Sequence, residues 1–113
     1  MRMKGKTEMI KTTLLYPNHD GARFDFDYYE NSHLPMVLAR LGSAIKHIGI
    51  DRGVAGGAPN ASSPFVVLAH MQFESVEEFQ RAMAPHLEHI MQDVPNFTDI
   101  VPVPMISTSI LEA

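Results

Sequence analysis

Histidine is the residue type in this 113-residue sequence that is best suited to acid–base chemistry, since there are six histidines and no cysteine. His33 is the first candidate. It follows Tyr29 by four residues, which places both side chains on one helical face, and Pro35 disturbs the helix beside it. Because the end of a helical segment favours a positive charge, we expect a His33 imidazolium that acts as a general acid or holds an anion. A capping histidine on the surface is the alternative interpretation.

Two further histidines lie in segments where apolar and polar residues alternate. If Arg52 pairs with Phe65 across a simple hairpin, equal steps inward place His47 opposite His70, with ~5 Å between their Cβ atoms. Two imidazoles at that distance could hold a ligand carboxylate or share a proton, and like-charge repulsion would keep one of them neutral. The alternative is a pair of half-exposed strand histidines, because a shift in register removes the pairing.

Other motifs for metals, cofactors or nucleophilic catalysis are missing. His86 and His89 stand three residues apart, but no HExxH motif is present and no third ligand is fixed, so we predict no metal site. Cysteine is absent, which excludes disulfides and thiolate ligands and makes the cytoplasm the expected compartment. The motifs GxGxxG, GxxxxGK and GxSxG are also absent, so we expect no cofactor.

The composition and charge of the chain limit the classes of partner that it is expected to bind. Nine basic and thirteen acidic residues give a net charge of -4, which argues against nucleic acid. No apolar run approaches the ~20 residues needed to cross a bilayer, so we expect no membrane partner either.

The hydrophobic pattern predicts one domain over residues 9–112, preceded by a flexible tail at residues 1–8. Alternation predicts strands at residues 9–16, 44–52, 65–74 and about 100–111. N-capping residues predict helices after Asp25 and Ser75, the first with a break or kink at residues 33–35 and the second with a kink at Pro85. The glycine-rich residues 53–64 predict a mobile loop.

This β-α-β-β-α-β order predicts a ferredoxin-like fold of the α+β class, a four-stranded antiparallel sheet with two helices on one face. One set of strand residues is apolar enough for the helix side: Ile10, Leu14, Ile48, Ile50, Val67 and Phe73. The other face mixes polar and apolar residues: Lys11, Thr13, His47, Gly49, Leu68, His70 and Gln72. Because the helices leave this second face uncovered, we expect a second copy to cover it, giving a homodimer with a half-polar cavity between the sheets.

Two stretches resemble the signatures of the EthD family, named after a protein of ethyl tert-butyl ether degradation. The first is Phe24-Asp25-Phe26-Asp27-Tyr28-Tyr29 with His33-Leu34-Pro35, and the second is Pro95-Asn96-Phe97-Thr98-Asp99. With the order of elements, the resemblance spans residues 9–112. It implies a dimeric α+β barrel and an association with oxidoreductases, and superfamily relatives include muconolactone isomerases and cofactor-free monooxygenases. Four residues map onto the first signature, namely Tyr28, Tyr29, His33 and Pro35, whereas His47 and His70 match no family motif.

The sequence therefore favours an EthD-like protein that binds a small, mostly apolar organic molecule in a dimer cavity, in oxidative catabolism or secondary metabolism. We expect His33 to contact the polar head group or to donate a proton, oriented by Tyr29. Tyr28, His47 and His70 are the expected ligand-binding residues. Two alternatives stay open, a cofactor-independent isomerase of a lactone-type substrate and a non-catalytic binding or assembly module.

Overall fold

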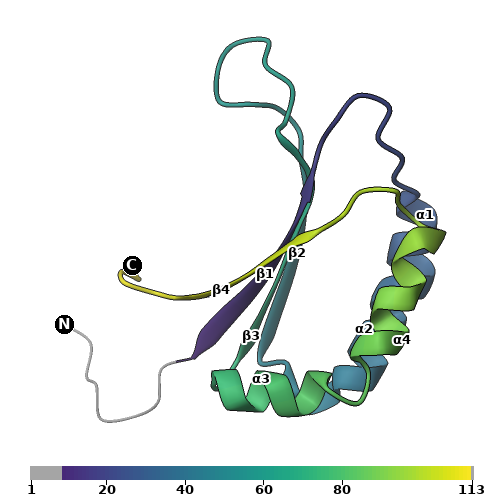
Figure 1. Ribbon diagram of the computed structural model, residues 1–113. Helices are drawn as coiled ribbons and strands as arrows, with labels where there is room; N and C mark the ends of the chain where they lie inside the picture. The colour runs from purple at the N-terminus through teal and green to yellow at the C-terminus, as the bar shows by residue number, and fades with distance from the viewer. Residues whose placement is uncertain (1–8, 113) are drawn as a thin grey trace.

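The computed structural model describes residues 9–112 and contains a four-stranded antiparallel sheet with all helices on one side (Figure 1). The strands are β1 (Ile10–Pro17), β2 (His47–Arg52), β3 (Phe65–Phe73) and β4 (Val103–Thr108). Their order in the sheet is β2-β3-β1-β4, so each helical crossover skips one strand. The predicted α+β, ferredoxin-like fold is confirmed. The tail predicted at residues 1–8 lies outside the described residues.

The first helical segment has no break at residues 33–35, where a break or kink was predicted, and the irregularity takes the form of a π-helical turn that ends at His33. The segment consists of α1 (Phe26–Tyr28), a π-helical turn η1 (Tyr29–His33) and α2 (Leu34–Leu41), and the 3-10 turn η2 (Gly42–Ala44) follows. In the π turn the N–H of Leu34 donates to the carbonyl of Tyr29, five residues back. Pro35 has no N–H to donate, and the wider turn accommodates its ring without interrupting the helix. Asp25 is the predicted N-cap, since its side chain accepts from the N–H of Tyr28.

The second helical segment is interrupted where Pro85 predicts a kink. It consists of α3 (Val76–Met83), α4 (Leu87–Asp93) and the 3-10 turn η3 (Val94–Asn96). Ser75 caps α3 by accepting from the N–H of Glu78, as predicted. No helix within residues 9–112 is both long enough and apolar enough to cross a membrane.

The helix side of the sheet forms the core. Tyr16, Val67 and Phe73 are each 1% exposed or less, and helix residues pack over them. Around Tyr16 the core is aromatic, with the rings of Phe24 and Phe97 within 6.1 Å of it between centroids. Figure 1 shows that no helix covers the opposite face of the sheet. The described part of the chain therefore has one packed face and one bare face, which matches the predicted division of the strand residues.

The predicted pairing of His47 with His70 was wrong. Arg52 pairs with Val67, so His47 lies opposite Gln72 and His70 lies opposite Gly49. Pairing with β2 begins at Val67 on β3, two residues later than expected, and just beyond this pair the N–H of Gly53 donates to the carbonyl of Val66. A shift of two residues keeps every side chain on its original face, so both histidines still lie on the bare face.

Candidate functional site

His33 lies in the interior between the two helical segments and is 4% exposed. Its ring stacks on Tyr29, with 5.7 Å between centroids and 15° between planes, and lies 4.5 Å from the ring of Phe97. The π turn places both Tyr29 and His33 toward the core. The alternative of a surface capping histidine was therefore wrong, and the expected side-by-side placement of Tyr29 and His33 is confirmed.

The carboxylate of Asp93, at the end of α4, accepts three hydrogen bonds. Nδ1 of His33 lies 2.9 Å from Oδ2, while the hydroxyl of Tyr28 donates to Oδ1 at 2.6 Å and the amide of Asn96 donates to Oδ1 at 2.9 Å. We call these four residues the Asp93 network. It joins the first helical segment to α4 and η3. The sequence prediction included Tyr28 and His33 but missed Asp93, because a contact across 60 residues leaves no local pattern.

The environment fixes the charges in this network. Partial burial raises the pKa of Asp93, but the hydrogen bonds from Tyr28, Asn96 and His33 outweigh it and hold the pKa below its ordinary value. Burial lowers the pKa of His33, and this effect outweighs the hydrogen bond and charge of Asp93, which raise it. The hydrogen bond to Asp93 is the main reason why the pKa of Tyr28 is raised, so Tyr28 stays a donor. The two pKa directions favour an ionised Asp93 and a neutral His33 near neutral pH, in contrast to the imidazolium expected from the helix end.

These charges determine the tautomer of His33. An ionised carboxylate only accepts hydrogen bonds, so Nδ1 of His33 carries the proton and Nε2 carries the lone pair. Among the described residues, no fully buried side-chain nitrogen or oxygen lacks a partner, and Nδ1 is the ring atom that is bonded. A neutral imidazole that is held by a carboxylate on Nδ1 and has its lone pair on Nε2 has the arrangement of a general base.

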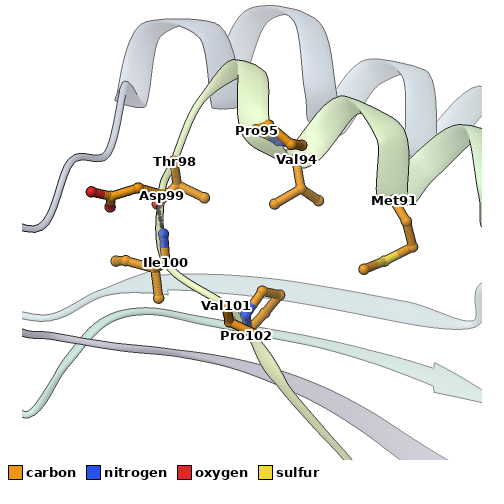
Figure 2. Close-up of a pocket in the computed structure, with 8 residues that line it drawn as sticks. All are labelled: Met91, Val94, Pro95, Thr98, Asp99, Ile100, Val101 and Pro102. Carbon is orange, nitrogen blue, oxygen red and sulfur yellow. Dashed lines mark hydrogen bonds between the residues drawn. The ribbon is translucent and has the colours of Figure 1, made fainter.

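An open surface pocket of about 340 Å³, called the cavity below, lies beside η3, between α4 and the segment that leads into β4 (Figure 2). Its lining is mainly apolar: Met91, Val94, Pro95, Ile100, Val101 and Pro102, with Thr98 and Asp99. The hydroxyl of Thr98 already donates to the carbonyl of Arg23, and Asp99 accepts from the N–H of Arg23. Val94 and Pro95 thus line the cavity while their neighbours Asp93 and Asn96 belong to the network. His33 itself does not line the cavity.

His47 and His70 lie on the other side of the sheet from His33. Ile50 packs against the core that contains Tyr29 and Phe97, and strand alternation turns His47 to the bare face. The expectation that His47 and His70 contact the same ligand as His33 was therefore wrong within a protomer, because the sheet separates them from His33. Tyr28 does reach the network, through Asp93.

His86 and His89, the two histidines considered for a metal, lie at the start of α4 and within it. Nε2 of His89 lies 3.2 Å from the guanidinium of Arg40. Within residues 9–112, no group of three His, Asp or Glu side chains is arranged to hold a metal ion.

Comparison with known proteins places this ferredoxin-like α+β chain in a family. The model of the EthD domain matches residues 21–100, a range that contains both signature stretches and the whole Asp93 network. The chain belongs to the EthD family. No curated protein matches it.

The solved structures similar to this chain include an EthD-like protein and more distant proteins that share its fold. An EthD-like protein from Ralstonia eutropha JMP134 is 43% identical, with a TM-score of 0.87 over 95% of this chain and 96% of that one. SnoaB from Streptomyces nogalater, a cofactor-independent oxygenase, shares the fold at 12% identity and a TM-score of 0.62, over 94% and 96% of the two chains. A dimeric ferredoxin-like protein of unknown function from Thermobifida fusca is 12% identical, with a TM-score of 0.57 over 96% and 97%.

Proposed function

We propose that this EthD-family protein binds a small, mostly apolar organic molecule and moves a proton on it with Nε2 of His33. The observation that carries the proposal is the pairing of a buried, neutral His33 with an ionised Asp93. Asp93 fixes the tautomer and stabilises the imidazolium that forms when Nε2 takes a proton. Tyr28 and Asn96 hold the carboxylate in place, so they are positioning residues.

The proton transfer suits a carbon acid or a phenol. In a β,γ-unsaturated carbonyl compound, Nε2 takes a proton from the carbon between the carbonyl group and the double bond, and the electron pair delocalises over the carbonyl oxygen and the γ carbon. The proton then returns from His33 to the γ carbon, and the double bond moves into conjugation with the carbonyl group. The product is an isomer, so no other reactant is needed. The aromatic rings of Tyr29 and Phe97 around His33, and the apolar cavity beside Asp93, support an apolar substrate.

This sequence of steps favours the cofactor-independent isomerase among the alternatives. A substrate carbanion that meets O2 instead of a second proton would lead to an oxygenase, the activity named for SnoaB. Either outcome agrees with a role in oxidative catabolism or secondary metabolism. The lack of cysteine supports the cytoplasm as the compartment.

We also propose that two copies pack through their bare faces. Val103 and Met105 lie on that face and are each 49% exposed, and the half-buried Leu15 and Leu68 lie beside them. A second copy buries the same patch twice, as an isologous interface does. Sedimentation equilibrium tests this proposal, and a monomer at high concentration overturns it.

The activity is tested with a small β,γ-unsaturated lactone, whose double bond moves into conjugation and changes the ultraviolet absorbance. We expect catalysed isomerisation by the protein and a loss of roughly 10²- to 10⁴-fold in the His33→Gln variant. His86→Gln, in the turn between α3 and α4 and outside the network, is the control and should keep the activity. If His33→Gln binds and isomerises the lactone as the unmodified protein does, His33 is not the base. If the lactone binds without any turnover, the protein is a binding module.

A further inference from the structure

The bare face of the sheet is organised in rows that run across all four strands. Gln72 lies opposite both His47 and Lys11, and Lys11 lies opposite Ser107. We call these four residues the polar row. The next row along the strands contains Gly49, His70, Thr13 and Met105, and the third contains Asp51, Leu68, Leu15 and Val103. The face is therefore polar along one row and mainly apolar two rows away.

Every member of the polar row can donate a hydrogen bond, and none is acidic. The row combines an ammonium, an imidazole, a primary amide and a hydroxyl. No hydrogen bond or ion pair links these four side chains to any side chain of residues 9–112. The acidic residues closest along the strands are Asp51, two rows away on β2, and Glu74, just beyond the end of β3.

His70 adds a further donor next to the row. A Cβ atom on Gly49 would lie 2.5 Å from Nε2 of His70, so the ring of His70 lies across β2 at Gly49. Gly49 is two residues from His47 on the same face of β2. The glycine therefore makes room for the imidazole of His70 beside His47. Three nitrogen-bearing side chains that can carry positive charge, those of Lys11, His47 and His70, thus share this part of the face.

Enclosure by a second copy would remove this group from water. A buried ammonium is strongly disfavoured unless an opposite charge pairs with it. The polar row offers no such charge, Asp51 lies at the other end of the face, and within residues 9–112 Glu74 forms no ion pair with Lys11. An organic anion supplies the missing charge, and its apolar part can lie against the row of Leu15, Leu68 and Val103.

We infer that the polar row binds the anionic group of a small organic acid between two bare faces. The carboxylate accepts from Lys11, with Gln72 and His47 as further donors. This site is distinct from the Asp93 network, which lies on the opposite side of the sheet. It rests on the dimer of the proposed function but not on the chemistry of His33.

The test is a calorimetric titration of the full chain with benzoate and with octanoate, next to benzamide and octanamide as neutral counterparts. We expect the carboxylates to bind and the amides to bind roughly 10- to 100-fold more weakly. Lys11→Met should weaken carboxylate binding by a similar factor. Lys46→Met is the matched control, because it removes the same charge next to His47 while its ammonium donates to the carbonyl of Ser43, outside the row.

Sedimentation equilibrium on the same samples separates the possible failures. A dimer that binds neither carboxylate, or whose Lys11→Met variant binds benzoate as tightly as the unmodified protein, overturns the anion site and leaves the dimer intact. A monomer overturns the dimer and the anion site together, while the lactone assay still decides the role of His33.

Discussion

Substitutions of Asp93 distinguish the contribution of the Asp93 network to stability from its contribution to proton transfer. In Asp93→Ala the Nδ1–H of the buried His33 loses its acceptor, which costs about 1–3 kcal/mol. The hydroxyl of Tyr28 and the amide of Asn96 lie nearer the surface and regain water in part. We therefore expect the free energy of unfolding to fall by about 2–4 kcal/mol. With an m-value of ~1.5 kcal/mol/M, the urea midpoint should decrease by roughly 1–3 M.

Asp93→Asn should behave differently, because asparagine has nearly the same shape. Its oxygen can still accept from Tyr28 and Asn96, and its NH2 group then points at Nδ1 of His33. Neutral His33 can accept that hydrogen bond by moving its proton from Nδ1 to Nε2. We expect a loss of only about 1 kcal/mol in stability, together with a loss of basicity at Nε2. Lactone isomerisation should fall as far as in His33→Gln.

The measurement is a long-range proton–nitrogen correlation spectrum of the His33 ring, which shows which nitrogen carries the proton and needs no substrate. The unmodified protein should have the proton on Nδ1, and Asp93→Asn should have it on Nε2. Urea denaturation of both variants supplies the stability difference. A proton on Nε2 in the unmodified protein, or a fully active Asp93→Asn variant, would refute the assignment of His33 as a base held by Asp93.

Two further predictions follow from the buried histidine and from Gly49. Because burial lowers the pKa of His33, the unfolded chain binds a proton that the folded chain excludes as pH falls below about 6.5. The free energy of unfolding should therefore decrease as the pH falls through this range. It should decrease less steeply in His33→Gln than in a His19→Gln control. Equal slopes of unfolding free energy against pH, measured by urea denaturation, would contradict this. Gly49→Ala should displace the His70 ring and weaken benzoate binding severalfold, with stability changed by no more than about 1 kcal/mol, because the side chain can move. An unchanged His70 spectrum would count against this packing.

Strand alternation and helix caps were enough to predict the fold. Strand alternation depends on neighbours two residues apart, so Tyr16, Val67 and Phe73 were assignable to a packed face without knowledge of the partner strands. The strand register depends on how residues 53–64 close the hairpin, and that loop has no strong turn pattern. The register of His47 was therefore wrong by two residues, while its face was right.

The candidate site could be predicted only in part, for a similar reason. The spacing of Tyr29 and His33 is local and placed both rings together. Asp93 contacts His33 only because the two helical segments pack side by side, and the hydrophobic periodicity of each segment does not indicate which of their residues are in contact. The charge of His33 was mispredicted for the same reason: the helix-end argument includes the dipole but not the burial, and here the burial has the larger effect on the pKa.

The location of the two proposed sites on opposite faces has a consequence for stoichiometry. The Asp93 network is complete within one protomer, so a dimer has two of them. Two sheets can pack face to face about a two-fold axis that runs along the strands, and each row then faces the same row of the partner. If the axis runs across the strands instead, the polar row faces the partner's row of Leu15, Leu68 and Val103. Apolar residues pack best against apolar residues, so the first arrangement is favoured. It brings the two Lys11 side chains toward one another, where the two oxygens of a single carboxylate can accept a hydrogen bond from each ammonium. Titration of the dimer should then give about one benzoate per two chains, and one per chain would show that the rows do not face each other.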